Sequence, residues 1–192
     1  MTEKRSLKNL LFPFCSILML LLNSCNTDYE YTSNPCFLIY DNSVHQNSVI
    51  ASAMTTYSGV FVTISKTIKS GAAYYHFTSN QGTSADVPFN AIDQKRSLIL
   101  GYNNGIIVGY GNSIDGIFFA YDLQCPNCYN SNILPSRNYP LNVSANGIAT
   151  CNTCKRKYDL NNRGLIISGD KGDKLTRYYC TTTGAYGILT VN

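Results

Sequence analysis

Cys125-Pro126-Asn127-Cys128 and Cys151-Asn152-Thr153-Cys154 are two CxxC pairs inside the stretch Tyr121 to Asp159, with 22 residues between them. Each CxxC forms a tight turn that can direct two sulfurs to one ion, and two such turns can complete a tetrahedron of Cys ligands around zinc or iron. The basic residues 155–157 follow the second pair at once and would partly offset the negative charge of four thiolates. The spacing, slightly longer than in a common zinc ribbon, therefore predicts a four-cysteine metal site.

The composition favours strands and turns over helices. Charged residues make up 14% of the 192 residues and aromatic residues 12%, with 15 tyrosines and no tryptophan. The length suits one domain with a proper core. A formal net charge of +4, part of which comes from the N-terminal leader, does not indicate a nucleic-acid-binding protein.

The first 24 residues predict an export signal. A basic head precedes the mostly apolar run Leu10 to Leu22, and the stretch Leu22-Asn23-Ser24-Cys25 closes it. This resembles a bacterial lipoprotein signal, which implies a lipid on Cys25 and attachment to a membrane of the bacterial cell envelope, the outer membrane in our interpretation. An ordinary cleaved signal and an uncleaved membrane helix are the alternatives, although the run is short for a full span. Residues 25–34 then form a polar, flexible tether.

The chain from residue 35 onward shows one strand pattern after another. Alternating or short apolar runs rich in β-branched and aromatic residues predict strands, with turn residues between them. A short helix is expected over Phe89 to Arg96, with Asn90 as its cap. The expected strands include Cys36–Tyr40, Gly59–Ile68, Ala73–Thr78, Ile106–Tyr110, Ile117–Gln124 and Leu141–Val143. The sequence thus predicts an all-β fold.

The two histidines do not indicate catalysis. His45 lies in a Ser- and Asn-rich segment and is expected to be exposed, whereas His76 is expected on a sheet face, because no second ligand lies near it at metal-binding spacing. The sequence also shows no nucleophile–base arrangement, no Gly-rich phosphate loop and no ligand set with an open position. We therefore assign no catalytic residues and expect at most an electron-transfer subunit.

Five segments resemble parts of a Rieske [2Fe–2S] domain. They are Phe119–Asp122, Gly147–Thr150, Tyr158–Leu160, Leu175–Tyr179 and Tyr186–Val191. The likeness covers residues 105–192 through these motifs and residues 35–104 only through the strand pattern. It implies a Rieske-like antiparallel β-sandwich or barrel over residues 35–192, with a small zinc-ribbon-like metal-binding subdomain at about 121–160.

The ligand pattern of the family changes when it is carried over to this chain. Rieske loops hold one iron with two Cys and the other with two His. Cys125 and Cys151 match the two Cys ligands. Cys154 stands where the second His would be. Asn127 occupies the place of the first His, and Cys128 beside it is the natural replacement. An all-thiolate set removes the two His that raise a Rieske potential and make it depend on pH.

Four thiolates leave several centres open. A closed structural zinc site is the first interpretation, because two CxxC turns suit one tetrahedral ion. A rubredoxin-like single iron, an all-Cys [2Fe–2S] cluster and two disulfides without metal are the alternatives. The zinc site makes the protein a structural or binding module. A single iron or an all-Cys [2Fe–2S] cluster makes it an envelope electron-transfer protein with a redox protein as its partner.

Cys36 and Cys180 remain after the leader, lipid and metal cysteines are assigned. In a Rieske-like fold the first and last strands belong to the same base sheets. The resemblance therefore implies that these two cysteines lie close together and form a disulfide in the oxidising envelope. Two separate buried thiols are the alternative.

Overall fold

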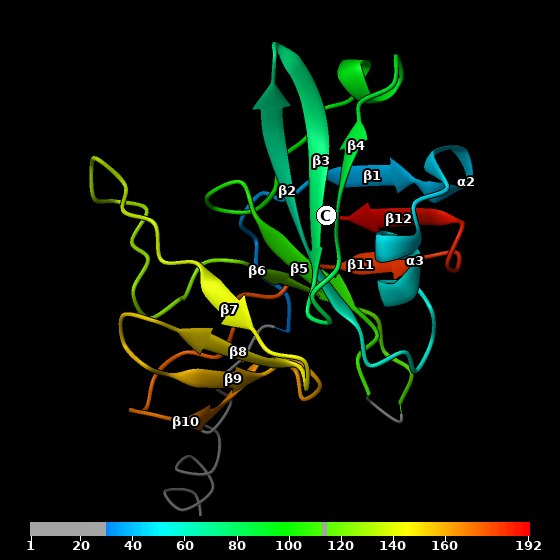
Figure 1. The fold of residues 1–192 in the computed structure, drawn as a ribbon. Helices are drawn as coiled ribbons and strands as arrows, with labels where there is room; N and C mark the ends of the chain where they lie inside the picture. The colour runs from blue at the N-terminus through cyan, green and yellow to red at the C-terminus, as the bar shows by residue number, and fades with distance from the viewer. Residues whose placement is uncertain (1–29, 113–114) are drawn as a thin grey trace, which may run out of the picture. The chain divides into compact units, whose positions relative to one another are not determined.

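The structure is a computed structural model that describes residues 30–112 and 115–192. Residues 31–192 form one compact unit. The predicted leader, the predicted lipid site Cys25 and the first half of the tether lie outside the described residues. Twelve strands in three antiparallel sheets, with two short α-helices, make up the described part of the chain and confirm the all-β fold (Figure 1).

The largest sheet has five strands in the order β4-β3-β2-β5-β6. The long hairpin of β2 and β3 pairs over eight residue pairs, from Val62 with Ser79 to Lys69 with Ala72. Strand β5 is buried along its whole length, as expected for a strand with both faces covered. The strands are β2 (Phe61–Lys69), β3 (Ala72–Ser79), β4 (Ser84–Pro88), β5 (Ile106–Gly109) and β6 (Phe119–Asp122).

A three-stranded sheet joins the two ends of the described chain. Its order is β1-β12-β11, with β1 (Leu38–Asp41), β11 (Cys180–Thr182) and β12 (Ile188–Val191). Strand β12 lies between the other two, and its Val191 is paired with Leu38 on one side and with Cys180 on the other. The first and last strands therefore belong to one sheet.

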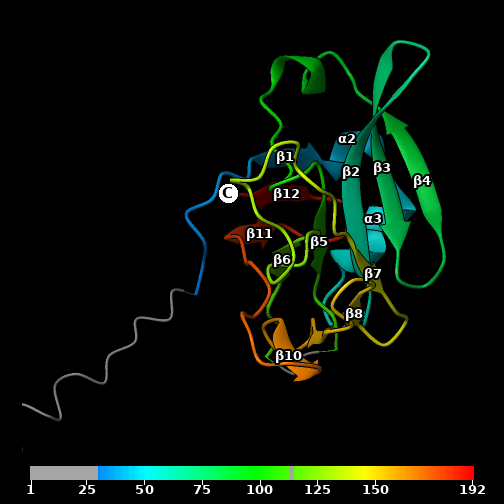
Figure 2. The ribbon, with the colours of Figure 1, turned by 90° about the vertical axis from the view of Figure 1, so that its left-hand side faces the viewer.

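The third sheet is a four-stranded meander in the order β10-β9-β8-β7. Its strands are β7 (Leu141–Val143), β8 (Ile148–Cys151), β9 (Lys157–Asp159) and β10 (Leu165–Ser168). A turn at Asn146-Gly147, a residue pair typical of hairpins, joins β7 to β8, and Gly147 adopts the positive φ of 76° that favours glycine. This sheet carries the second CxxC pair at the end of β8 (Figures 1 and 2).

Two hydrophobic cores lie on opposite faces of the five-stranded sheet. Because side chains alternate along a strand, Val62 and Ile64 of β2 enter one core while Phe61 enters the other. The first core also takes Leu38 and Val191 from the three-stranded sheet, so two sheets enclose it as in a sandwich (Figure 2). The second core lies below the CxxC pairs and contains Cys125, Cys151, Tyr121, Tyr158 and Leu160, all nearly inaccessible to solvent.

The helices differ from the prediction. The expected helix over Phe89 to Arg96 is only the 3-10 turn η2 (Asp93–Lys95), whose N-cap is Ile92 and not Asn90. The side chain of Asn90 accepts hydrogen bonds from the N–H groups of Ile92 and Asp93 just before this turn. Two short helices, α2 and α3, occupy the Ser- and Asn-rich segment around His45, where no helix was predicted. They span Asn42–His45 and Ser48–Ala53, and the side chains of Asp41 and Asn47 cap them.

One of the five segments that resemble a Rieske domain forms no regular strand. Leu175–Tyr179 takes part only in an isolated bridge between Tyr121 and Arg177, and β11 begins at Cys180. The expected strand Ile106–Tyr110 is found as β5, which pairs with the distant strand β2 and with β6. Within the described residues, no helix has both the length and the apolar character that crossing a membrane would require.

Candidate metal centre

The first CxxC pair follows strand β6 directly. The N–H of Cys125 donates to the carbonyl of Tyr139 (2.9 Å), which joins the start of this turn to the chain returning toward β7. The N–H groups of Cys128 and Tyr129 both donate to the carbonyl of Cys125, at 3.1 and 2.9 Å. These hydrogen bonds close a compact turn that places the sulfurs of Cys125 and Cys128 on one side.

The second CxxC pair caps the hairpin between β8 and β9. The N–H of Lys155 donates to the carbonyl of Cys151 (3.0 Å), the same four-residue closure as in the first turn. Lys155 has a positive φ of 61°, which reverses the chain so that Arg156 can pair with Cys151 through a hydrogen bond of 3.0 Å. Two equivalent turns from different parts of the chain therefore face each other.

The structure brings the four predicted cysteines together. The sulfurs of Cys125, Cys128, Cys151 and Cys154 all lie within 4.8 Å of one another. Two separations between the turns are 3.7 Å, from Cys125 to Cys154, and 3.8 Å, from Cys128 to Cys151. Cys125 and Cys151 are buried, whereas Cys128 and Cys154 are partly accessible at the surface.

This sulfur arrangement fits one tetrahedral metal ion. A Zn–S distance of about 2.3 Å in tetrahedral geometry places neighbouring sulfurs about 3.8 Å apart. The separations of 3.7 and 3.8 Å between the turns match that value, and the others remain within 4.8 Å. The four thiols can therefore hold a metal ion, and the geometry by itself leaves the identity of the metal open.

A buried tyrosine below the site supports one of the thiols. The hydroxyl oxygen of Tyr158 in β9 lies 3.2 Å from the sulfur of Cys125. Asn127 donates its side-chain N–H to the same hydroxyl oxygen at 2.9 Å, and when Cys125 is a thiolate the hydroxyl of Tyr158 is the donor to its sulfur. The residue at the place of the first Rieske His is thus a supporting donor and contributes no ligand atom.

The surroundings shift the pKa values of three of the thiols, and not all in the same direction. Burial raises the pKa of Cys125 to about 11, even though the Tyr158 hydroxyl and the N–H of Asn127 favour its thiolate. Burial also acts on Cys154, but the N–H and guanidinium of Arg156 outweigh it and lower the pKa to about 6. Burial and the charge on its neighbours raise the pKa of Cys128 well above its ordinary value. The metal-free cluster would therefore carry its first negative charge on Cys154.

Arg156 and Asn127 also fasten a third segment to the two turns. Arg156 donates to the carbonyls of Asp170 and Lys171, both at 3.0 Å. Asn127 exchanges hydrogen bonds with the backbone of Asp173, at 2.8 and 2.9 Å. Residues 169–173 thereby form a strap over the site. Their role as a strap over the site depends on contacts between residues 14 to 46 positions apart, which no local pattern reveals.

Cys36 and Cys180 are free thiols in the structure. Both belong to or pack against the first core, and burial raises their pKa values to about 11 and about 12. Cys36 precedes strand β1, and Cys180 begins strand β11. Strand β12 lies between these two strands, so β1 and β11 are two strand spacings, or about 9.5 Å, apart. The sulfur of Cys180 donates to the carbonyl of Phe118 (3.3 Å). Their pairing stays a prediction, and it would require the two backbones to approach.

His45 is buried, which contradicts the expectation that it is exposed. Only 7% of its side chain is accessible, and its Nε2 lies 2.9 Å from a carboxylate oxygen of the equally buried Asp93. The hydroxyl of Tyr75 donates to the other oxygen of Asp93 (3.2 Å), and the ring of Tyr40 stacks on His45 at 4.9 Å. The partners lie up to 48 residues away in sequence, so the polar context of His45 concealed this network.

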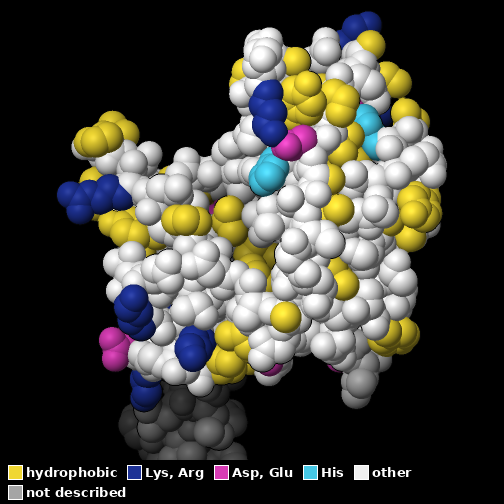
Figure 3. All heavy atoms as spheres, viewed as in Figure 1, with side chains coloured by type: hydrophobic (Ala, Val, Ile, Leu, Met, Phe, Trp, Pro, Cys, Tyr) yellow, Lys and Arg dark blue, Asp and Glu magenta, His cyan; other side chains and the backbone are white. Residues whose placement is uncertain are grey.

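His76 lies on the sheet face, as expected. Its Nδ1 is 2.9 Å from the Asp86 carboxylate, and its Nε2 is 3.1 Å from the hydroxyl of Thr78. Lys69 shares the same carboxylate at 2.5 Å, and these hydrogen bonds with Lys69 and His76 lower the pKa of Asp86. Figure 3 shows basic, acidic and histidine side chains together over β2 to β4. We interpret this cluster as an exposed ion-pair network.

The comparisons with known proteins assign no family. No protein-family model matches the chain. No curated protein matches it either. The function is therefore inferred from the residues and from the geometry of the site.

Proposed function

We propose that this protein is a lipid-anchored, Rieske-like envelope protein in which four cysteines hold one zinc ion as a structural centre. The observation that carries the proposal is the sulfur cluster, in which all four Sγ atoms lie within 4.8 Å of one another. A tetrahedral ion needs this spacing, and zinc prefers four thiolates in closed structural sites. All four positions are filled by the protein, so the site leaves no coordination position for a substrate.

The spacing favours one ion over a two-iron cluster. A [2Fe–2S] cluster holds its two Cys pairs on separate irons, which spreads the pairs further apart than one tetrahedron does. Here sulfurs of opposite pairs approach each other to 3.7 Å, Cys125 with Cys154, and to 3.8 Å, Cys128 with Cys151. The same contacts would have to lengthen for two irons to fit between the turns.

The position of the cluster supports a structural role. It joins the turn after β6 to the hairpin of β8 and β9, and thereby links the five-stranded sheet to the four-stranded sheet above the second core. Structural zinc sites contribute their binding energy to folding because the unfolded chain has no preformed site. Loss of the ion would free both turns and expose Cys125 and Cys151.

Two further features support the Rieske-like part of the proposal. The first and last strands, β1 and β12, pair in one sheet, as the resemblance implied. The metal-binding turns belong to β6 and to a separate four-stranded sheet, which matches the implied small subdomain at about 121–160. The lipid anchor rests on the N-terminal sequence alone, with Cys25 as its attachment point.

A second candidate function uses the same geometry with iron. A single iron on four thiolates would make the protein an envelope electron carrier, and one observation favours it: Cys128 and Cys154 are accessible at the surface, where a redox protein could approach them. Zinc has no redox chemistry, so the two functions exclude each other. The visible spectrum of the purified protein separates them.

The structural role is tested by removing ligands one at a time. Cys125→Ser and Cys151→Ser each leave three thiolates, and we expect both to lose the metal and to melt at a much lower temperature than the wild-type chain. Cys36→Ser is the matched control, because it also removes a buried thiol but lies outside the cluster. Ligand variants that lose the metal yet melt like the wild type would contradict a structural centre.

A further inference from the structure

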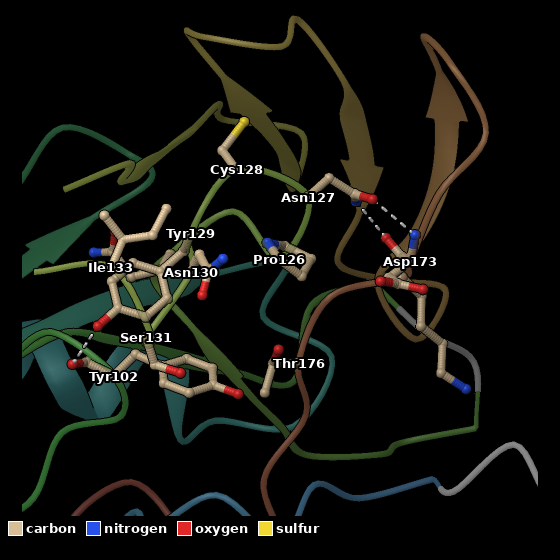
Figure 4. A pocket seen from close by; sticks show the side chains of 12 residues that line it. Tyr102, Pro126, Asn127, Cys128, Tyr129, Asn130, Ser131, Ile133, Asp173 and Thr176 are labelled. Atoms are coloured by element: carbon tan, nitrogen blue, oxygen red, sulfur yellow. Dashed lines mark hydrogen bonds between the residues drawn. The ribbon is translucent and has the colours of Figure 1, made fainter. Parts of the chain in front are cut away.

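A cavity of about 610 Å³ opens beside the first CxxC turn. Figure 4 shows Tyr102 and Tyr129 at one side of it, Pro126 at its middle and Asp173 at the far side, while the sulfur of Cys128 points away from its centre. The volume lies in the range of small-molecule sites in proteins. The cavity therefore shares a wall with the metal centre, and Cys128 is the metal ligand in its lining.

Two lining amides are already held by hydrogen bonds, which fixes that wall. Asn127 donates to Tyr158 and to the carbonyl of Asp173, and its oxygen accepts from the N–H of Asp173. Gln124 donates to Asn138 (2.7 Å), and its oxygen accepts from the N–H of Tyr139 (2.7 Å). These side chains shape the cavity, and both N–H groups of Asn127 are used within the protein.

Other polar groups in the lining are available. Within residues 30–112 and 115–192, no hydrogen bond engages the carboxylate of Asp173 or the hydroxyls of Ser131 and Thr176. Asn130 accepts one bond from the N–H of Asn132 (2.9 Å), and its side-chain N–H group is unused there. The cavity thus offers a carboxylate that accepts, hydroxyls that both donate and accept, and an amide that donates.

One side of the cavity is aromatic. The rings of Tyr102 and Tyr129 lie with centroids 5.0 Å apart and planes tilted by 36°, and both are partly exposed. The hydroxyl of Tyr129 donates to the carbonyl of Tyr102 (3.3 Å), which fixes the orientation of the pair. Tyrosine presents an apolar ring body and a polar tip, so this side can pack against the C–H face of a ligand while the edge stays wet.

We propose that this cavity binds a neutral saccharide. Adjacent hydroxyls of a sugar can donate to Asp173 and exchange hydrogen bonds with Ser131, Thr176 and Asn130, while the ring packs on the tyrosine side. An anion would meet the carboxylate of Asp173, with a single lysine in the lining to compensate. An apolar ligand would bury the carboxylate and the hydroxyls without partners. The lining therefore selects a ligand that is uncharged and rich in hydroxyls.

The saccharide site does not depend on which ion occupies the cysteine cluster. None of the available groups is a metal ligand, and the metal would act on the cavity only by holding the first turn in place. A failure to bind sugar would therefore leave the metal proposal intact. The reverse case is visible in the same experiment, because the metal content of each sample is measured.

The test uses the purified full chain in a detergent without a sugar headgroup. Saturation-transfer NMR first surveys four neutral disaccharides, namely cellobiose, maltose, lactose and diacetylchitobiose, and calorimetry tests inorganic phosphate as the anionic comparison. Calorimetry then measures Kd for any disaccharide that binds. Asp173→Asn removes the accepting carboxylate, and Asp170→Asn is its matched control, because both acids are exposed on the same strap and only Asp173 lines the cavity.

We expect at least one disaccharide to bind and Asp173→Asn to weaken it by about 10-fold or more, because a hydrogen bond to a charged group is lost. Thr176→Val should weaken binding by about 5-fold, and it carries the test if Asp173→Asn does not fold. Asp170→Asn should change Kd by less than about 2-fold. The proposal is wrong if no disaccharide binds with a Kd below about 10 mM, if phosphate binds better, or if both Asp variants behave alike.

Discussion

Tyr158→Phe removes one oxygen atom from the support of the metal centre. Tyr158 is inaccessible to solvent, and the variant keeps the ring that packs in the second core. The lost hydroxyl lies 3.2 Å from the sulfur of Cys125 and accepts from Asn127 at 2.9 Å. Since Asn127 also donates to the carbonyl of Asp173, the substitution leaves that side chain with a partner. The main effect therefore falls on the thiolate of Cys125.

The size of the effect follows from the charge on that thiolate. A hydrogen bond to a charged group contributes about 1.5–3 kcal/mol, and each 1.4 kcal/mol corresponds to a factor of about ten in an equilibrium constant. We therefore expect Tyr158→Phe to weaken zinc binding by about 10- to 100-fold, the range typical of groups that support metal ligands. Tyr121→Phe is the matched control, because Tyr121 is equally buried in the same core but donates to the carbonyl of Leu160 at 2.9 Å.

Competition with a chromophoric chelator measures the zinc affinity of each variant, and thermal unfolding is recorded with and without metal. Tyr121→Phe should lose about 1 kcal/mol of unfolding free energy in both states while keeping its zinc affinity. Tyr158→Phe should differ from it only in the metal-loaded state. A Tyr158→Phe variant that binds zinc within about 3-fold of the wild type would refute the reasoning that the hydroxyl stabilises a metal-bound thiolate.

Three further predictions use other parts of the domain. Arg156→Met should weaken zinc binding more than Lys157→Met, because Arg156 holds a hydrogen bond to Cys154. The loss should be larger at low salt than at high salt, because salt screens the interaction between the two charges. Chelator competition at two salt concentrations measures both differences. Burial raises the pKa of Asp122, so the folded state binds its proton more tightly than the unfolded chain does. The free energy of unfolding should therefore fall as the pH rises above about 4, and urea titrations should show a smaller fall for Asp122→Asn. Burial raises the pKa of Cys36 to about 11 and that of Cys180 to about 12. Alkylation of these two thiols in the native protein at pH 8 should therefore be at least about 100-fold slower than alkylation of a free thiol. If the two cysteines resist alkylation even when the chain is unfolded without reductant, they form the disulfide instead.

The metal centre could be predicted from the sequence because its information is local. Each CxxC turn brings two sulfurs together by itself, and turn residues such as Asn146-Gly147 define the hairpin that presents the second pair. Only the meeting of the two turns needs the fold. The strands β2 and β3 were predictable for the same reason, since alternation over eight or nine residues is a strong local signal.

The supporting residues could not be predicted, because their partners are distant in sequence. Tyr158 lies 33 residues from Cys125, and Asn127 lies 46 residues from Asp173. His45 was expected to be exposed, because short polar segments usually form loops. The capping of two short helices by Asp41 and Asn47 instead turns its ring inward to Asp93. The positions and partners of such side chains are known only once the chain is folded.

The metal content of the aerobically purified full chain tests the central claim most directly. Elemental analysis, acid-labile sulfide and the visible spectrum are measured on one sample. We expect a colourless protein with about one zinc per chain and no labile sulfide, because four sulfurs within 4.8 Å of one another form one closed tetrahedral site. A coloured protein with iron, or a metal-free protein whose four cysteines are paired in disulfides, would contradict the structural zinc centre.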